Sequence, residues 1–229
     1  MLRVSSPSPN FTERRGTSKP DMVVLHYTAT LSATEALGTL CSSKAQVSSH
    51  YLISENGCIF NLVDENKRAW HAGLSHWGGV SDINSHSIGI ELSNDGFSPF
   101  GEKLMGSLET LLKEIFKKWN IPVHRVLGHS DISPGRKIDP GRKFDWERLS
   151  LNGLAVYVEK KDTLKFDQDK FVSDLKAFGY NVEIPFEILL ESFRLRFNPL
   201  ASGALNNIDA TVANDLAVKY PVDVEKNNI

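Results

Sequence analysis

Short apolar segments separated by polar residues dominate the first two thirds of the chain. Met22–Leu25 is a continuous apolar run, which is typical of a strand buried on both faces. Residues 51–53 and 58–63 form two further apolar segments, and the pair Asn56-Gly57 lies between them. An Asn-Gly pair in this position predicts a β-hairpin.

The segment Ser87–Leu92 alternates apolar residues with small or polar ones, which predicts a strand with two different faces. A carboxylate on its polar face can point into a groove, with a glycine leaving room beside it. A further short strand is predicted at Val126–Gly128. The apolar face of the first strand consists of Ile88, Ile90 and Leu92, and the opposite face of Ser87, Gly89 and Glu91.

Two helices are predicted among these strands. Glu102–Trp119 carries leucines and other apolar residues at the spacing of an amphipathic helix, and Ala33–Leu40 predicts a shorter one. Strands that alternate with helices indicate an α/β fold with a central mixed β-sheet flanked by helices. We assign this main domain to residues 21–150, preceded by an extended N-terminal arm over residues 1–20, which are rich in Ser, Pro, Arg and Thr.

The pattern changes after Leu149. Residues 151–163 are predicted to form a linker, with a short strand at Leu154–Val158. Residues 164–229 then show three short helical patterns separated by natural helix stops, which predict a small three-helix domain. The patterns are Asp167–Phe178, Pro185–Phe197 and Asp209–Tyr220.

The composition excludes several classes of protein. The chain has 229 residues, with 26 Lys+Arg against 28 Asp+Glu and a formal net charge of -2, which argues against a nucleic-acid binder. No apolar run reaches the length of a transmembrane helix, and the first ten residues lack the apolar core of a signal peptide. Cys41 and Cys58 form no CxxC pair, so a disulfide framework or a cysteine metal site is not expected.

Two histidines lie where predicted strands run into loops. His26 follows the first strand, His129 follows Val126–Gly128, and Asp139 lies ten residues beyond His129. Two imidazoles and one carboxylate, with a fourth position left to water, are a common arrangement for catalytic zinc. Taken singly, each residue has an ordinary structural alternative: a surface histidine at a strand end, or an aspartate in a turn before Pro-Gly.

Five ordered motifs lie between about Met22 and Leu149. They are Leu25-His26-Tyr27-Thr28, residues 47–53 (VSSHYLI), Ala69-Trp70-His71-Ala72-Gly73, Ser87-Ile88-Gly89-Ile90-Glu91 and residues 128–141 (GHSDISPGRKIDPG). Their order and spacing resemble those of the type 2 N-acetylmuramoyl-L-alanine amidases. That family shares its fold with the peptidoglycan recognition proteins.

The resemblance implies a role for each matching residue. His26, His129 and Asp139 would ligate one Zn²⁺, with Glu91 as the acidic and Lys137 as the basic catalytic residue. The implied reaction is hydrolysis of the amide bond between N-acetylmuramic acid and L-alanine, in peptidoglycan or in muropeptides. A non-catalytic peptidoglycan recognition protein is the alternative, although such relatives typically lack a metal ligand that this chain retains.

Five other residues are expected to contact the substrate. Trp70 and His71 belong to a motif that resembles part of the family's substrate groove. His50 also lies in a motif, although a structural role at the start of a strand is the alternative. Trp77 and Asn84 fall in the variable segment between motifs and are expected to line the groove.

The C-terminal segment resembles a helical peptidoglycan-binding domain over about residues 164–222, more loosely than the first match. A three-helix module that caps the amidase domain is the alternative, because Phe193 and Phe197 at helical spacing are typical of a core. A wall-binding module favours the periplasm or cell envelope, which we expect, while the missing signal peptide favours the cytoplasm. The oligomeric state is not predicted.

Overall fold

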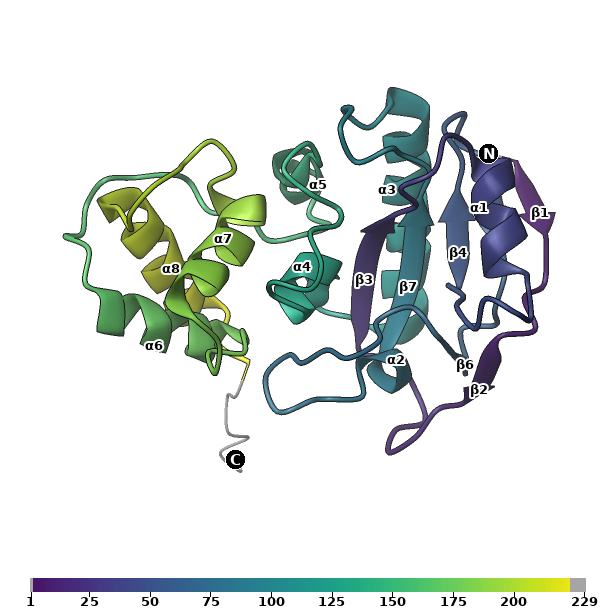
Figure 1. Cartoon of the computed structure of the whole chain (residues 1–229), viewed down its shortest axis with the longest axis horizontal. Helices are drawn as coiled ribbons and strands as arrows, with labels where there is room; N and C mark the ends of the chain where they lie inside the picture. Colours follow the sequence, from purple (N-terminus) through teal and green to yellow (C-terminus); the bar gives the residue numbers. More distant parts are fainter. Residues whose placement is uncertain (1, 223–229) are drawn as a thin grey trace.

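A mixed β-sheet forms the centre of the molecule (Figure 1). The computed structural model describes residues 2–222. The sheet has six strands in the order β1-β5-β4-β7-β3-β8, which confirms the predicted fold class. The strands are β1 (Arg3–Ser5), β3 (Met22–Tyr27), β4 (Tyr51–Ile53), β5 (Ile59–Asn61), β7 (Ser87–Leu92) and β8 (Val126–Gly128).

Strand β3 lies between β7 and β8 and pairs in parallel with both. Its residues Met22–Leu25 are completely buried, as predicted for a run covered on both faces. β4 joins β7 in parallel and pairs antiparallel with β5, which confirms the predicted hairpin. In the hairpin turn Gly57 has a φ of +86°, and a Cβ there would lie 2.6 Å from the carbonyl oxygen of Lys103, so the turn requires glycine.

Helix α3 (Glu102–Trp119) covers one face of the sheet, with the bounds that its apolar spacing predicts. Its buried side, which includes Leu108 and Leu112, belongs to one core cluster with Ile88 and Ile90 of β7. The helix ends at Asn120, whose left-handed backbone (φ 55°, ψ 41°) cannot continue it. The apolar face predicted for β7 is therefore the face that α3 covers.

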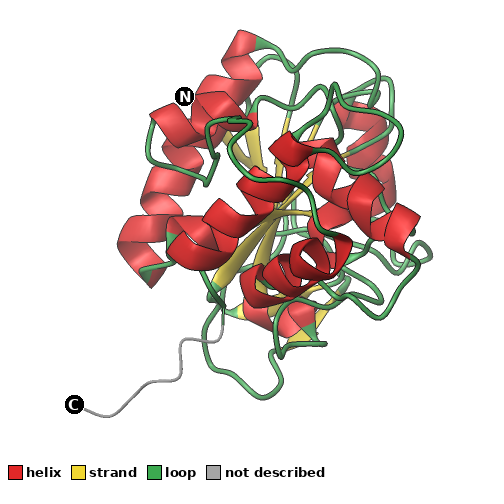
Figure 2. Cartoon of the chain, turned by 90° about the vertical axis from the view of Figure 1, so that its left-hand side faces the viewer, coloured by secondary structure: helices red, strands yellow, loops and turns green. Residues whose placement is uncertain are grey.

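The opposite face of the sheet is covered at its two ends and open between them. α1 (Ala33–Leu40) packs over β4 through Leu52. At the other end, the C-terminal helices pack over Met22 and Val24 of β3 and over Leu127 of β8, and Figure 2 shows these helices in front of the strands. The gap between the two groups contains the cavity described below.

The C-terminal unit consists of three helices, each within two residues of its predicted bounds: α6 (Gln168–Phe178), α7 (Phe186–Phe197) and α8 (Asn207–Lys219). Phe193 and Phe197 are buried in the core that this unit shares with the sheet. They are therefore packing residues and not a platform for a ligand. Residues 223–229, which the sequence assigned to the same unit, lie outside the described part of the chain.

The expected N-terminal arm over residues 1–20 is wrong, because this segment is built into the fold. β1 forms the edge of the main sheet beside β5, and β2 (Phe11–Glu13) pairs antiparallel with β6 (Lys67–Ala69). Three-residue strands with exposed ends carry too few residues to show a period. The remaining helical segments are α2 (Ile83–His86), α4 (His129–Ile132), α5 (Trp146–Leu151) and the 3₁₀ turn Val123–Arg125.

The strand expected at Leu154–Val158 is also wrong: in the described structure this segment begins with a bend and pairs with no strand. Leu154 packs into the core under α3, whereas Val156 and Val158 pack into the core of the C-terminal helices. All five residues are apolar because the segment passes between two cores. Burial on both sides therefore produced a strand-like pattern without a neighbouring strand.

A buried ion pair joins the C-terminal helices to the sheet domain. Asp131 on α4 and Arg196 on α7 lie 2.8 Å apart, and their side chains are 0% and 1% exposed. The Tyr180 hydroxyl donates to Asp131 Oδ1 at 2.6 Å, and the backbone N–H of Gly128 donates to Oδ2 at 2.8 Å. Because α4 begins at His129, two side chains of the C-terminal unit hold the short helix that carries a predicted metal ligand.

We expect Arg196→Met to lower the free energy of unfolding by about 3–5 kcal/mol, because the Asp131 carboxylate then stays buried without its charge partner. Urea titration measures the change. The double variant with Asp131→Asn should recover part of the loss, since no unpaired charge remains. Lys219→Ala, which removes an exposed pair with Asp215, is the control and should cost less than about 0.5 kcal/mol. An Arg196 variant no less stable than this control would contradict the prediction.

Candidate functional site

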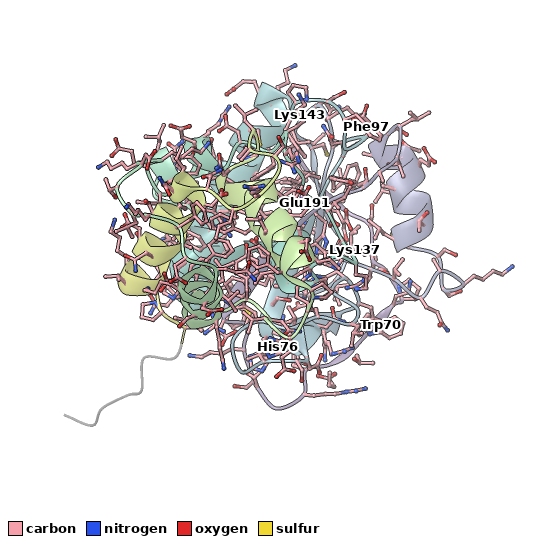
Figure 3. The ribbon with its side chains drawn as sticks, turned by 60° about the vertical axis from the view of Figure 1, so that its left-hand side comes forward. Trp70, His76, Phe97, Lys137, Lys143 and Glu191 are labelled. Atoms are coloured by element: carbon pink, nitrogen blue, oxygen red, sulfur yellow. The ribbon has the colours of Figure 1, made fainter. Side chains whose placement is uncertain are left out.

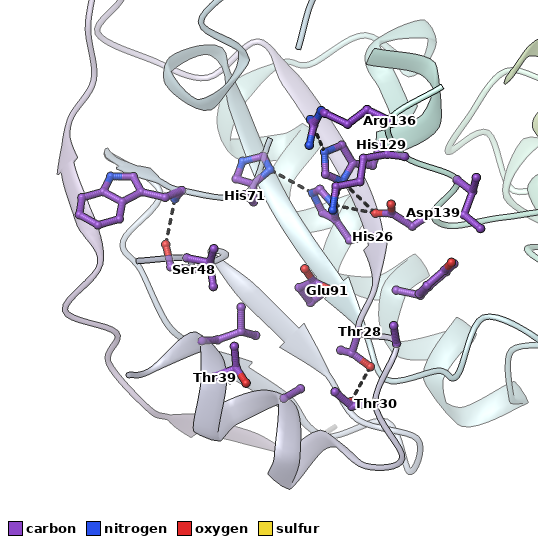
Figure 4. A pocket seen from close by; sticks show the side chains of 18 residues that line it. His26, Thr28, Thr30, Thr39, Ser48, His71, Glu91, His129, Arg136 and Asp139 are labelled. Atoms are coloured by element: carbon purple, nitrogen blue, oxygen red, sulfur yellow. Dashed lines mark hydrogen bonds and ion pairs between the residues drawn. The ribbon is translucent and has the colours of Figure 1, made fainter. Parts of the chain in front are cut away.

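Three potential ligand atoms meet at the C-terminal ends of β3 and β8 (Figure 4). His26 Nδ1 lies 2.9 Å from His129 Nδ1, and Asp139 Oδ2 lies 3.0 Å from each of them. All three side chains are buried. The three residues predicted to ligate a metal, which are separated by 103 and 10 positions in the chain, are therefore brought into one cluster.

The strand pairing explains this convergence. In the β3–β8 register Leu25 lies opposite Gly128, so His26 and His129 follow side by side where the two strands end. Parallel strands present their C-terminal ends at the same edge of a sheet. The chain then returns through α4, and the backbone N–H of Ser130 donates to the carbonyl oxygen of Asp139 at 2.9 Å, which holds the carboxylate beside the two imidazoles.

The electrostatics of the cluster suit a cation. Burial, and next the charge of His129, lowers the pKa of His26 from its ordinary 6.5 to about 4. Burial alone would raise the pKa of Asp139, but the adjacent side chains of His129 and His26 outweigh it and hold this pKa below its ordinary value. A neutral imidazole and an ionised carboxylate are the forms in which these side chains bind metals.

Glu91 lies on the same face of the sheet as His26, because the two residues are directly paired in the β3–β7 register. Its side chain lines the cavity, which agrees with the groove-facing orientation predicted from the alternating pattern. Oε2 is buried and has no hydrogen-bond partner within the described chain. Burial, followed by the charge of Asp139, raises the pKa of Glu91 well above its ordinary value. An unpartnered carboxylate with a raised pKa is suited to proton transfer.

The cluster opens into a cavity of about 620 Å³ between α1 and the loop that carries Asp139. Lys137 lines this cavity two residues before Asp139, and Figure 3 shows it on the face where Trp70 also lies. Trp70 and His71 form part of the wall, as expected from their motif. The volume is in the range of pockets that hold small organic ligands.

Arg136 is a lining residue that the sequence analysis did not assign to the site. Its guanidinium donates to the carbonyl oxygens of Ala72 at 2.6 Å and of Leu74 at 2.7 Å, and to Ser133 Oγ at 2.7 Å. These bonds fix the loop that carries Lys137 against the segment after Trp70. The one sequence signal for this role was the position of Arg136 inside the last motif.

Trp77 and Asn84 do not line the groove, so both expectations are wrong. Trp77 is 1% exposed and packs edge-on against Tyr180, where the C-terminal helices meet the sheet domain. The side chain of Asn84 is turned to the backbone: its Oδ1 accepts the N–H groups of His71 at 3.0 Å and of Ala72 at 2.8 Å. A variable segment between motifs gave no periodicity that would show which side chains point inwards.

His50 is also buried away from the groove, so its predicted contact with substrate is wrong and the structural alternative holds. Its Nδ1 accepts the backbone N–H of Gly89 at 2.9 Å, and its Nε2–H donates to the carbonyl oxygen of Lys67 at 3.0 Å. The ring thus satisfies one backbone group of β7 and one of β6. Burial is the largest factor that lowers the pKa of His50, from 6.5 to about 4.

Comparison with known proteins shows similarity to amidases. The model of the N-acetylmuramoyl-L-alanine amidase family matches residues 16–142. The amidase AmiD of Escherichia coli is 33% identical over 88% of this chain and 84% of its own length. The 1,6-anhydro-N-acetylmuramyl-L-alanine amidase AmpD of Haemophilus influenzae is 48% identical over 45% of this chain and 56% of its own.

Solved structures extend the similarity to the C-terminal helices. A complex of Escherichia coli AmiD with its substrate anhydro-N-acetylmuramic acid-L-Ala-D-gamma-Glu-L-Lys superposes with a TM-score of 0.82 at 30% identity, covering 93% of this chain and 99% of that one. AmpDh3 of Pseudomonas aeruginosa gives 0.79 at 29% identity, over 93% of this chain and 97% of its own. This chain belongs to the N-acetylmuramoyl-L-alanine amidase family. The predicted family, fold and enzyme class are confirmed, and the recognition-protein alternative is not supported.

The pKa of His50 predicts a pH-dependent stability. An unfolded histidine binds a proton below pH 6.5, whereas the buried ring stays neutral down to about pH 4, so stability falls as the pH decreases through this window. In metal-free protein, we expect His50→Gln to reduce the loss of unfolding free energy between pH 7 and pH 4.5 by roughly 2 kcal/mol. Urea titrations at the two pH values measure it, and an unchanged pH dependence would show that His50 is not buried as a neutral ring.

Proposed function

We propose that this chain binds one Zn²⁺ through His26, His129 and Asp139 and hydrolyses the amide bond between N-acetylmuramic acid and L-alanine in muropeptides. The observation that carries the proposal is the meeting of three ligand atoms beside the unpartnered Oε2 of Glu91, at the wall of one cavity. The amidase relatives support the reaction, and the geometry supports the assignment of the residues.

The donor set fits zinc. Two imidazole nitrogens and one carboxylate oxygen leave a fourth tetrahedral position for water or substrate, as in other catalytic zinc sites. Ligands held at 2.0–2.1 Å from a tetrahedral ion are about 3.3 Å apart, close to the 2.9–3.0 Å between these atoms. When bound, Zn²⁺ supplies Lewis-acid polarisation of the scissile carbonyl and a lowered pKa for water.

Side chains of the protein transfer the protons of the reaction and stabilise the negative charge that develops in it. Glu91 Oε2 takes a proton from the attacking water as the new C–O bond forms, and it delivers a proton to the L-alanine nitrogen as the C–N bond breaks. The Lys137 ammonium, which lines the same cavity, stabilises the negative charge that develops on the carbonyl oxygen. The raised pKa of Glu91 suits both transfers, because the group can gain and lose a proton within one cycle.

We propose a soluble anhydro-muropeptide as a substrate, because such a molecule occupies the similar AmiD structure. Trp70 lies at the cavity wall, where its ring can contact a sugar or peptide group. None of the described helices is both long and apolar enough to cross a membrane. The periplasm or cell envelope stays a prediction, as does glycan binding by the C-terminal helices.

Replacing Glu91 with Gln removes the proton carrier while keeping the shape of the side chain. We expect at least a hundredfold loss of kcat, on the order of what general acid–base catalysis contributes, with the Zn²⁺ content unchanged. Turnover is measured by mass analysis of the released stem peptide, and bound metal by elemental analysis. Near-normal turnover of the variant would refute the assignment of Glu91.

Removal of the metal tests the cofactor. We expect a chelator to abolish cleavage of both soluble anhydro-muropeptides and sacculi wherever the enzyme cleaves them, and added Zn²⁺ to restore it. Mass analysis of the products identifies the bond that is cut. Full activity in protein shown by elemental analysis to be metal-free would overturn the proposal. Comparison of the two substrates also shows whether soluble fragments or intact wall is preferred.

A further inference from the structure

The imidazole of His26 is connected on its far side to a chain of hydrogen bonds that ends on the backbone. His26 Nε2 lies 3.0 Å from His71 Nδ1. A dashed line marks this contact in Figure 4. His71 Nε2 lies 3.1 Å from Ser87 Oγ, and the Ser87 hydroxyl donates to the carbonyl oxygen of Ile83 at 2.6 Å. Each nitrogen and oxygen of the side chains between the His26 imidazole and that carbonyl therefore has a hydrogen-bond partner.

The carbonyl oxygen of Ile83 sets the direction of the whole chain, because it can only accept. The single hydroxyl proton of Ser87 is used on Ile83, so Ser87 Oγ must accept a proton from His71 Nε2. The Nδ1 of a neutral His71 then carries a lone pair and accepts from His26 Nε2–H. His26 is thereby left with its lone pair on Nδ1, the atom that faces Asp139 and His129.

Ala72, the residue after His71, orients the imidazole of His129 in the same way. His129 Nε2 lies 3.0 Å from the carbonyl oxygen of Ala72, so its N–H donates there and its Nδ1 keeps the lone pair. Asn84 Oδ1 accepts the backbone N–H groups of both His71 and Ala72, at 3.0 and 2.8 Å. One buried amide therefore holds the two consecutive residues that contact the two histidines.

Gly89 makes room for this arrangement on β7. A Cβ at position 89 would lie 2.5 Å from the His71 ring, so any side chain there would displace the ring from His26. Both nitrogens of His71 are occupied by protein partners, Nδ1 by His26 and Nε2 by Ser87. Although His71 lines the cavity, it has no free nitrogen for a hydrogen bond to substrate.

We infer that His71 and Asn84 are positioning residues for the metal site: together with the Ala72 carbonyl they select the Nε2–H form of His26 and His129 and aim both Nδ1 atoms at the ion. The inference rests on the proposed zinc function. Residues that orient metal-bound histidines in this way typically change the metal affinity by about 10–100-fold when they are replaced.

The test is the Zn²⁺ dissociation constant of purified protein, measured by competition with a chromophoric chelator at fixed pH. We expect His71→Phe to weaken binding by about 10–100-fold, because His26 Nε2–H loses its acceptor and the other tautomer is no longer disfavoured. Asn84→Leu should weaken binding in the same direction, since it releases the backbone of residues 71 and 72. Gly89→Ala should do so as well, by pushing the His71 ring.

Two matched variants separate positioning from general stability. Asn84→Asp keeps an oxygen that can accept both N–H groups and should retain the wild-type dissociation constant. His50→Gln alters a completely buried histidine that contacts no metal ligand through a hydrogen bond, so it should leave the dissociation constant unchanged while lowering the melting temperature of metal-free protein. Circular dichroism of each variant confirms that it is folded.

The outcomes distinguish this inference from the proposed function. If the wild type binds no Zn²⁺, or if His26→Ala binds it as tightly as the wild type, the proposed function itself fails. If the wild type binds Zn²⁺, His26→Ala loses it, and both His71→Phe and Asn84→Leu bind as tightly as the wild type, only the positioning role is wrong. Weaker binding in those two variants, with Asn84→Asp and His50→Gln unaffected, supports it.

Discussion

The site depends on the parallel pairing of β3 with β7 on one side and with β8 on the other. This pairing fixes the register in which Glu91 lies opposite His26 and in which His129 follows Gly128, so one backbone ladder places a proton carrier and two imidazoles at one edge of the sheet. A slip by one residue would turn Glu91 to the face that α3 covers, where its carboxylate would be buried among Ile88 and Ile90.

Around this edge the protein satisfies buried polar groups with the backbone. The imidazoles of His26 and His129 are buried. The Nε2 of His129 faces the carbonyl oxygen of Ala72, and the Nε2 of His26 faces His71, whose own hydrogen bonds lead to a carbonyl oxygen. Because these partners already fix each ring, the ring loses less conformational freedom when it binds an ion. This is the physical basis of a preorganised site. The cavity side is left to Glu91 Oε2, a buried carboxylate oxygen without a hydrogen-bond partner in the described structure.

The C-terminal helices contribute to this arrangement from behind. They cover the end of the sheet face beside β8 with a shared apolar core, and Arg196 and Tyr180 both bind the Asp131 carboxylate on the helix that begins with His129. Removal of these helices would expose Met22 and Leu127 and leave the Asp131 carboxylate without its charge partner. The C-terminal helices are therefore part of the structure that supports the site.

Sequence alone determined the elements with a sustained period, such as Glu102–Trp119, and the motif residues, because spacing and residue type are local properties. It also gave the groove-facing side of Glu91 from strict alternation. Only the tertiary structure decided that Trp77 packs under the C-terminal helices and that His50 and Asn84 serve the backbone. These roles depend on which segments, distant in the chain, are brought together, and a single buried polar residue carries no local pattern that identifies its partner.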